Sequence, residues 1–431
     1  MTQNSWYHLR FLVVAVLVAN FCCAVVSAQD TLGMTLQDAQ KSFLQNNFQL
    51  LAAKYNIDAN RALIRQAKVW DNPVLSTDQN IYDAQGGFLK HNAASGQIYL
   101  QLTQLIRTAG KRNKLAQVAE DNTIISSEQF DDLVRTLRYT LISDLFEIDH
   151  QLKLKSVFDS EIARLQILVT ATDAQLKAGN VSEKDDIRVK ALLFGLQNEL
   201  VNIKATIIPV ESELKLLIKN NDNVFIKPQL NYYLPDIIKI QLPPKQQLID
   251  SALQNRPDAK LARSQMDYQH HNLSYQKALV KPDVSIGSEY DQRSSYAPNY
   301  IGLAISLPLN IFNKNKGNIS SAQFSIKQQE VLADWESSKI ANDVSTAYDK
   351  TTFYQQVNNL EQLDFSLHYD QLFQSMLTSY QKRQISLLEF IDFNDAYKES
   401  KLKLLDQHTA LIKSMLELNY QVGNDVITIN K

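Results

Sequence analysis

Residues 42–76, SFLQNNFQLLAAKYNIDANRALIRQAKVWDNPVLS, align without a gap on residues 251–285, SALQNRPDAKLARSQMDYQHHNLSYQKALVKPDVS. The identical positions include Asn46 with Asn255, Lys68 with Lys277, and Pro73 with Pro282. A second register relates later segments, in which Val181-Ser182 matches Ile385-Ser386. Self-similarity at a spacing of about 200 residues predicts an internal duplication, in which each half builds the same supersecondary unit.

The N-terminus is predicted to be a secretory signal peptide. Basic side chains precede an apolar run over residues 11–26, and a small-residue cleavage pattern ends at Ala28. An anchor helix is the alternative. Both cysteines, Cys22 and Cys23, lie inside this segment, so the mature chain is expected to form no disulfide and no thiolate metal site. Lipidation is not expected, because the large residue Phe21 precedes the cysteines.

Composition bounds the class of protein. The net charge of −2 argues against a nucleic-acid partner. The chain has 11 glycines and 10 prolines among 431 residues, which is well below usual frequencies of about 7% and 5%. It is therefore expected to be mostly long helix. No apolar run after residue 28 approaches the roughly 18 residues that a membrane helix needs.

Helical periodicity is predicted over residues 36–69 and 245–279, and each segment ends before a proline, which disfavours helix in the residue that precedes it. Short interruptions are expected at residues 46–48 and 255–258. Each half later forms a helical hairpin, over about 110–217 and 318–422. The first arm of each hairpin is predicted to be about 70 residues, which corresponds to on the order of 100 Å. Apolar residues spaced three and four apart predict coiled-coil packing between the hairpins.

Four segments of about ten residues alternate apolar with polar side chains, which is the weak signature of transmembrane β-strands. They lie at residues 74–82, 97–105, 283–290 and 300–308. In the last one, Ile301, Leu303 and Ile305 share one face, whereas Gly302 and Ala304 share the other.

These patterns divide the chain into five parts. We expect a signal peptide over 1–28, a first repeat over 29–218, an irregular external linker over 219–244, a second repeat over 245–423 and a C-terminal tail over 424–431.

Four amphipathic strands cannot span a bilayer alone, because open edges leave backbone groups without partners in hydrocarbon, at a cost of several kcal/mol each. Small barrels need about eight strands or more. Several copies are therefore expected to pool their strands around a symmetry axis, with the helical hairpins continuing the barrel as a tube. Physical reasoning leaves a dimer, a trimer and a tetramer open.

Four short motifs, in this order on a duplicated frame, resemble those of the TolC family of outer membrane efflux proteins. They are AGKR at 109–112, ALQNRPD at 252–258, LPLNIFNKNKG at 307–317 and LLEFID at 387–392. The first and third are most similar to the CzcC/CusC-type branch, which serves heavy-metal efflux.

The resemblance implies a mainly α-helical fold with membrane β-structure, in which a homotrimer forms a twelve-stranded barrel in the outer membrane of a Gram-negative cell. An α-helical tunnel would cross the periplasm and meet a periplasmic adaptor and an inner-membrane pump of RND type. Outer membrane lipid is the other implied partner. No enzymatic activity, cofactor or resident metal is expected.

Glu389 and Asp392 follow the second hairpin turn and share a helix face at a spacing of three residues. The resemblance places them at the periplasmic entrance, where a ring of carboxylates favours cations. Asp185 holds the matching position after the first turn, where Lys184 and Arg188 could pair with acids of the adjacent hairpin. The alternative is that all these side chains lie on solvated helix faces.

The residues of the two turns are the candidate contacts for the adaptor. They are Gly179, Asn180, Val181, Ser182, Arg383, Gln384, Ile385 and Ser386. Gly179 is also the residue that a helix end favours, because glycine adopts positive φ without strain.

Two alternatives remain open at this point. A secreted or periplasmic coiled-coil scaffold without a pore would explain the helices but not the alternating segments. The same duct could also serve drug efflux or type I protein secretion instead of metal. His270 and His271 are adjacent on a helix and point about 100° apart, so they are not expected to chelate a metal.

Overall fold

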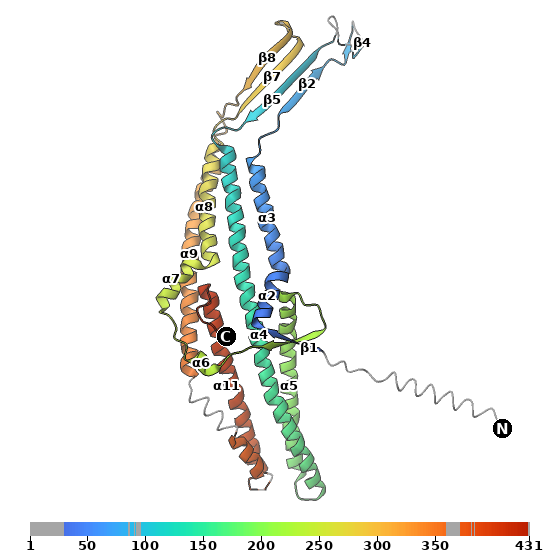
Figure 1. Ribbon diagram of the computed structural model, residues 1–431, viewed down its shortest axis with the longest axis vertical. Helices are drawn as coiled ribbons and strands as arrows, with labels where there is room; N and C mark the ends of the chain where they lie inside the picture. The colour runs from blue at the N-terminus through green and yellow to red at the C-terminus, as the bar shows by residue number, and fades with distance from the viewer. Residues whose placement is uncertain are drawn as a thin grey trace, which may run out of the picture.

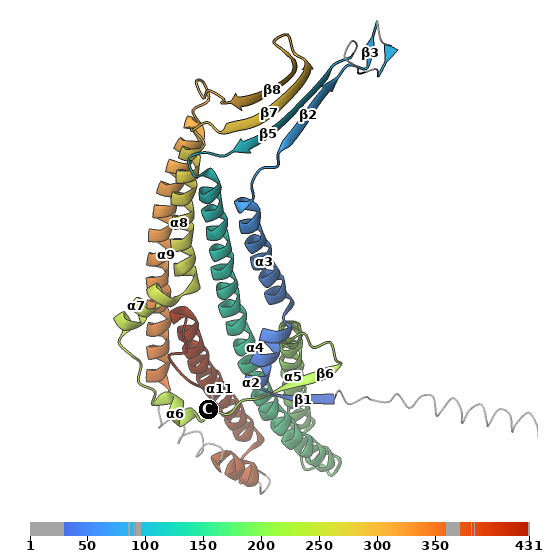
Figure 2. The ribbon, with the colours of Figure 1, turned by 45° about the horizontal axis from the view of Figure 1, so that its top comes forward.

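The computed structural model describes residues 30–84, 87–89, 91, 96–358, 371–380, 382 and 384–429. The expected signal peptide lies outside this part of the chain. The molecule is elongated, with a sheet at one end and helices that run from the sheet to the other end (Figure 1). A second view shows the sheet bending away from the axis of the helices (Figure 2).

The helices of the described residues alternate with groups of strands along the chain. Their bounds are α2 Leu36–Asn46, α3 Phe48–Lys68, α4 Lys111–Lys177, α5 Glu183–Ile218, α6 Leu234–Ile238, α7 Lys245–Asn255, α8 Pro257–Ala278, α9 Lys316–Val357 and α11 Leu387–Val422. Residues 371–380 are also helical. The strands are β1 Asp30–Thr35, β2 Val74–Gln79, β3 Tyr82–Asp83, β4 Gly87–Phe88, β5 Ile98–Ile106, β6 Val224–Gln229, β7 Val284–Arg293 and β8 Pro298–Ser306.

The four long strands form one antiparallel sheet in the order β2-β5-β7-β8. One face is apolar: Leu75, Leu102 and Leu303 lie in one row across it, with Ser288 between the last two. The opposite face is polar, and on it the Tyr99 hydroxyl donates to Glu289 at 2.9 Å. Within the described residues, β2 and β8 have a strand on only one side, so both outer edges of the sheet are open.

The helix–helix–strand segments at 36–79 and 245–293 are each interrupted by a single residue between two helices. Asn47 makes the first break, where its side-chain oxygen accepts from the amides of Gln49 and Leu50 while its Nδ2 donates to the Leu217 carbonyl at 2.9 Å. Pro257 begins the second helix of the other segment, because it lacks the N–H that a first-turn residue does not need.

The segment 219–244 differs from the irregular external linker that the prolines predict. Residues Val224–Gln229 form β6, which pairs in parallel with β1, and Ile237 of α6 is buried. Ile226 is 0% exposed and packs with apolar residues of α2, α4 and α5. Part of the segment therefore belongs to the core, because burial of its apolar side chains stabilises the fold despite the prolines.

The second long helix also ends earlier than predicted. α4 spans 67 residues, whereas α9 stops after 42, where Asn358 leaves helical geometry at φ −91° and ψ 91°. The Asn358 amide is buried and donates to the carbonyls of Tyr354 and Gln407. A side chain that binds two carbonyls in this way replaces the hydrogen bonds that a continuous helix would make.

The C-terminal tail packs onto the molecule as well. Ile427 and Ile429 are buried in the same cluster as residues of α4, α9 and α11. The Asn419 side chain fixes this return, since its Nδ2 donates to the Ile427 carbonyl at 2.7 Å and its Oδ1 accepts from the Ile427 amide at 2.9 Å.

Burial of β6 gives a testable prediction. Ile226→Ala should lower the free energy of unfolding by about 2–5 kcal/mol, because it removes buried methyl groups and leaves a cavity. Lys227→Ala changes the adjacent exposed residue and should have little effect. Urea unfolding in detergent measures both, and equal stability of the two variants would contradict the packing described here.

Candidate channel entrance

Both hairpin turns lie at the end of the molecule farthest from the sheet (Figure 1). The first follows α4, where Gly179 has φ +75° and its amide donates to the Leu176 carbonyl at 2.9 Å. The Asn180 amide donates to the Gln175 carbonyl at 2.9 Å and completes the helix end. Positive φ explains glycine at this position, since a side chain there would strain the backbone.

Asp185 is turned toward the start of its own helix. Ser182 is the N-cap of α5: its Oγ accepts from the Asp185 amide at 3.2 Å and donates to the Asp185 carboxylate at 2.7 Å. Burial of Tyr380, in the helical segment before the second turn, raises the pKa of that tyrosine, and the charge of Asp185 adds to the shift.

Glu389 holds the same position in the second hairpin. Ser386 caps α11, and the two residues form a reciprocal capping box in which the Ser386 amide donates to the Glu389 carboxylate at 2.7 Å. The Ser386 Oγ adds a second hydrogen bond at 2.8 Å. These bonds, the backbone one first, lower the pKa of Glu389. Asp392 is exposed one turn further along α11.

The structure thus assigns Asp185 and Glu389 a shared structural task that the sequence analysis missed. Both are the third residue after a serine N-cap, which is the S-x-x-[D/E] signature of a helix start. The signal was present in the sequence, at residues 182–185 and 386–389. Capping does not remove the carboxylates from solvent, so a second role in the entrance stays compatible with it.

The remaining predicted residues lie as follows. Asn180, Ser182, Gln384 and Ser386 are exposed, whereas Val181 and Ile385 are half-buried. Arg383 lies outside the described residues. Lys184 and Arg188 are exposed, and within the described part of one chain neither forms an ion pair.

A different ion cluster joins the two helices of the first hairpin. Asp186 is 3% exposed and accepts from Lys190 at 2.7 Å, and Lys190 also contacts Asp173 of α4 at 2.6 Å. The two hydrogen bonds, that to Asp173 first, raise the pKa of Lys190. This cluster fixes α4 against α5 close to the turn.

Higher up, a carboxylate is buried at the seam between α4 and α11. Glu161 is 2% exposed, and among the described residues neither of its carboxylate oxygens has a hydrogen-bond partner. Its neighbours in α4, Phe158 and Ile162, pack with Phe390 of α11. Burial raises the pKa of Glu161 to about 7, although the charges of nearby Arg164 and Lys398 oppose the shift; Asp395 adds to it.

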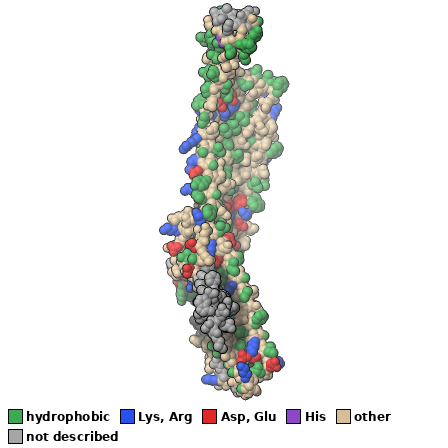
Figure 3. All heavy atoms as spheres, turned by 90° about the vertical axis from the view of Figure 1, so that its right-hand side faces the viewer, with side chains coloured by type: hydrophobic (Ala, Val, Ile, Leu, Met, Phe, Trp, Pro, Cys, Tyr) green, Lys and Arg blue, Asp and Glu red, His purple; other side chains and the backbone are tan. Residues whose placement is uncertain are grey.

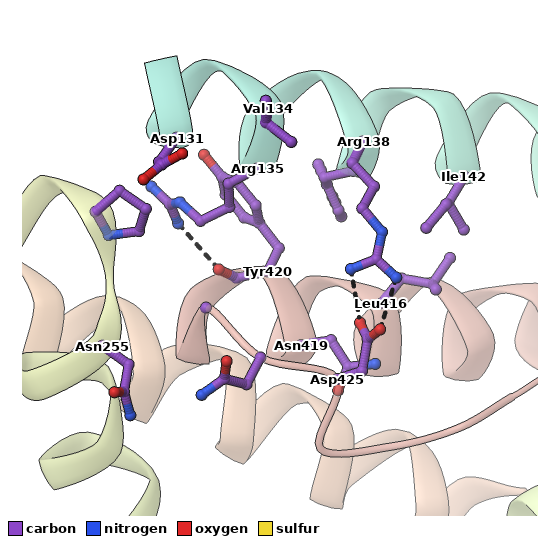
Figure 4. A pocket seen from close by; sticks show the side chains of 14 residues that line it. Asp131, Val134, Arg135, Arg138, Ile142, Asn255, Leu416, Asn419, Tyr420 and Asp425 are labelled. Atoms are coloured by element: carbon purple, nitrogen blue, oxygen red, sulfur yellow. Dashed lines mark hydrogen bonds and ion pairs between the residues drawn. The ribbon is translucent and has the colours of Figure 1, made fainter. Parts of the chain in front are cut away.

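Toward the middle of the molecule, the end of α11 is fastened to α4 and to the break between α7 and α8. A cavity of about 220 Å³ lies there, and its charged side chains bind one another (Figure 4). Arg138 pairs with Asp425 at 2.6 Å, and Arg135 donates to the Tyr420 carbonyl at 2.9 Å. We interpret this cavity as a structural joint.

Arg256 of the ALQNRPD motif belongs to the same joint. Its guanidinium is buried and donates to Asp258 at 3.0 Å and to the Gln421 carbonyl at 3.0 Å. Gly423 lies against it with φ +78°, and a Cβ added there would meet the Arg256 Cγ at 2.9 Å. The motif therefore ties the α7–α8 break to the C-terminus of α11.

Two helices present stripes of exposed apolar side chains. On α5, four residues at intervals of seven are each more than half exposed: Ile187, Phe194, Val201 and Ile208. On α3 and just before it, the exposed residues follow intervals of four and three: Leu44, Phe48, Leu51 and Tyr55. This spacing is that of a coiled-coil seam, and such exposed stripes mark interaction surfaces. Hydrophobic side chains also cover much of the sheet end (Figure 3).

None of the helices in the described residues is long and apolar enough to cross a membrane. Within the same residues, no group of three or more histidine, cysteine, aspartate or glutamate side chains is arranged to hold a metal ion.

Buried Glu161 predicts a pH dependence. The folded state favours the protonated carboxyl group of Glu161. Its contribution to the stability of the fold is therefore complete below the ordinary carboxyl pKa of 4.5 and is lost as the pH rises through about 7. Glu161→Gln should therefore raise the unfolding free energy at pH 8 by about 3 kcal/mol, since one pKa unit corresponds to about 1.4 kcal/mol. The two proteins should unfold alike at pH 4.

Urea unfolding at the two pH values measures this difference. Glu330→Gln, which alters an exposed carboxylate on α9, is the control and should change the pH profile far less. A Glu161→Gln profile parallel to that of the unmodified protein would show that the carboxylate is solvated.

Residues 40–218 match the family model of the outer membrane efflux proteins. The cobalt-zinc-cadmium resistance protein CzcC of Cupriavidus metallidurans is 26% identical over 308 residues, which cover 70% of this chain and 69% of CzcC.

Solved structures share the fold. The structure of CusC superposes with a TM-score of 0.72 at 16% identity and covers 90% of this chain and 92% of its own. The open state of the MtrE outer membrane channel of Neisseria gonorrhoeae gives a TM-score of 0.69 at 15% identity, covering 91% and 89%. These findings confirm the resemblance seen in the four motifs: residues 40–218 match the outer membrane efflux proteins, and the fold of the chain is similar to that of solved outer membrane channels such as CusC.

Proposed function

We propose that three copies of this chain form a passive exit duct of a tripartite efflux system. The observation that carries the assembly is the pair of open edges on β2 and β8. Backbone groups on these edges need partners in a membrane, and one chain does not supply them. Pooling three sheets gives the twelve-stranded barrel that the family resemblance implies.

The exposed helix stripes support the same assembly. Ile187, Phe194, Val201 and Ile208 of α5 repeat at the interval of a coiled-coil seam. The stripe on α3 lies nearer the sheet, so the two stripes serve different levels of the wall. Neighbouring copies would cover both, and the helices would then close into a tunnel. In this assembly the two repeats, 29–218 and 245–423, alternate around the axis.

The hairpin turns are the proposed docking site of the periplasmic adaptor. Exposed Asn180, Ser182, Gln384 and Ser386, together with half-buried Val181 and Ile385, are available at the end of the molecule. Gly179 shapes the first turn. The adaptor would connect this end to an inner-membrane pump of RND type, which supplies the energy, so that the duct itself needs no chemistry.

The proposed cargo is a metal cation. The relative CzcC is a cobalt-zinc-cadmium resistance protein, and it aligns with 70% of this chain. Exposed Glu389 and Asp392 would provide negative charge at the entrance, with Asp185 nearby on the first hairpin. The lowered pKa of Glu389 favours the charged form of that carboxylate. Rings of carboxylates attract cations and repel anions.

The gate can be tested without disturbing the helix start. Glu389→Gln combined with Asp392→Asn removes two charges per chain, and glutamine at the third helix position retains the capping box. Single channels of this variant in planar bilayers should show weaker cation selectivity, and block by a multivalent cation should require several-fold more blocker. Glu399→Gln is the matched control on the same helix. Unchanged selectivity and block would remove both residues from the entrance.

Growth of a deletion strain tests which cargo the duct carries. A strain that lacks the gene should become sensitive to cobalt, zinc or cadmium salts, and the unmodified gene should restore growth. Sensitivity confined to dyes and antibiotics would instead assign the duct to drug efflux. Loss of a secreted polypeptide, with neither sensitivity, would assign it to protein secretion.

A further inference from the structure

The apolar face of β8 continues beyond the end of the strand. Within β8, Ile301, Leu303 and Ile305 are each more than half exposed on the face that carries Leu75 and Leu102. The strand ends at Ser306, yet every second residue remains exposed and apolar through the following loop: Leu307, Leu309 and Ile311. Phe312 then follows with 98% of its surface exposed.

This loop is held in place by its asparagines. Asn310 donates to the Val280 carbonyl at 2.7 Å, and Asn315 donates to the Gln276 carbonyl at 2.8 Å. Between them, the Ile311 amide donates to the Leu309 carbonyl at 2.8 Å in a tight turn. Polar side chains thus face the end of α8, and the apolar ones are presented outward.

The charge next to Phe312 is positive. Lys314 and Lys316 are exposed, and within the described chain neither forms an ion pair. Asp283, between α8 and β7, is already bound by Lys111 at 2.7 Å. An aromatic ring followed by lysines, placed where an apolar face ends, is the pattern of a segment at the boundary between acyl chains and headgroups.

The junction between strand and helix in the first half, after β5, is built differently from the one after β8. Arg107 pairs with Asp71 at 2.7 Å, and the Thr108 amide donates to Asp283 at 2.8 Å. Those side chains are used within the chain. The exposed apolar and cationic side chains after β8 do not make such contacts within the described chain. The two junctions therefore differ, although the two halves resemble each other.

We propose that residues 307–316 form a membrane anchor. Leu309, Ile311 and Phe312 enter the headgroup boundary of the leaflet that faces the helices, and Lys314 and Lys316 contact phospholipid phosphates. A lipid surface fits better than a second copy, because the loop continues the apolar face of β8 and carries uncompensated positive charge. This anchor rests on the placement of the sheet in the membrane.

Fluorescence quenching tests the anchor in the full-length mature chain. All cysteines of the sequence lie at positions 22 and 23, so Phe312→Cys offers a single labelling site once the signal peptide is removed. The labelled protein is reconstituted in vesicles of phosphatidylethanolamine and phosphatidylglycerol. An environment-sensitive dye at this site should be quenched several-fold more by lipids with a shallow nitroxide than by aqueous iodide.

Two further single-cysteine variants provide the reference positions. Leu303→Cys marks the apolar face of β8, and Glu330→Cys marks α9 at about 20 Å from its start. Leu309→Cys repeats the test within the loop, in case Phe312→Cys fails to assemble. Lys314→Glu with Lys316→Glu, added to Phe312→Cys, should reduce lipid quenching and raise iodide quenching.

Each other outcome overturns the anchor. Iodide quenching at position 312 equal to that at 330 places the loop in water, and quenching by neither reagent places it against another copy. Lysine replacement without effect removes the phosphate contacts. If position 303 is lipid-quenched in these cases, the membrane sheet stands and the anchor alone fails; if it is not, the proposed channel fails first.

Discussion

Unpaired backbone groups on the outer edges of β2 and β8 are the constraint on which the rest of this structure depends. The sheet is apolar on one face and polar on the other, as a strand between lipid and a water-filled lumen requires. It cannot remain open in hydrocarbon. In the proposed assembly, sister chains close the sheet, and the exposed stripes on α3 and α5 continue the same interface along the helices.

The helical part is built to transmit that assembly over a long distance. α4 runs from the sheet almost to the entrance, and the other helices are fastened to it at intervals. Arg135 ties the C-terminal end of α11 to α4, and Arg256 ties the same end to the α7–α8 break. The Asp186–Lys190–Asp173 cluster ties α5 to α4. Between these joints, Glu161 is a buried carboxylate at the α4–α11 seam, without a hydrogen-bond partner among the described residues. Its raised pKa makes the packing of this seam sensitive to pH.

Much of this architecture could be predicted because its signals are local. The four strands show period-two alternation, and the break at Asn47 lies where asparagines interrupt the helical pattern. The parallel pairing of β1 with β6 was missed because it joins distant segments and its short strand contains Pro228. The end of α9 at Val357 depends on the contacts of Asn358 with a carbonyl of another helix. The capping role of Glu389 was readable, whereas the burial of Glu161 follows only from packing.

The central claim is that one chain supplies a third of a closed wall. Native mass measurement of the full-length mature protein, released from membranes in mild detergent, tests it most directly. The account predicts a particle of three chains that persists on dilution. A uniform monomer, or an assembly of two or four chains, would contradict it.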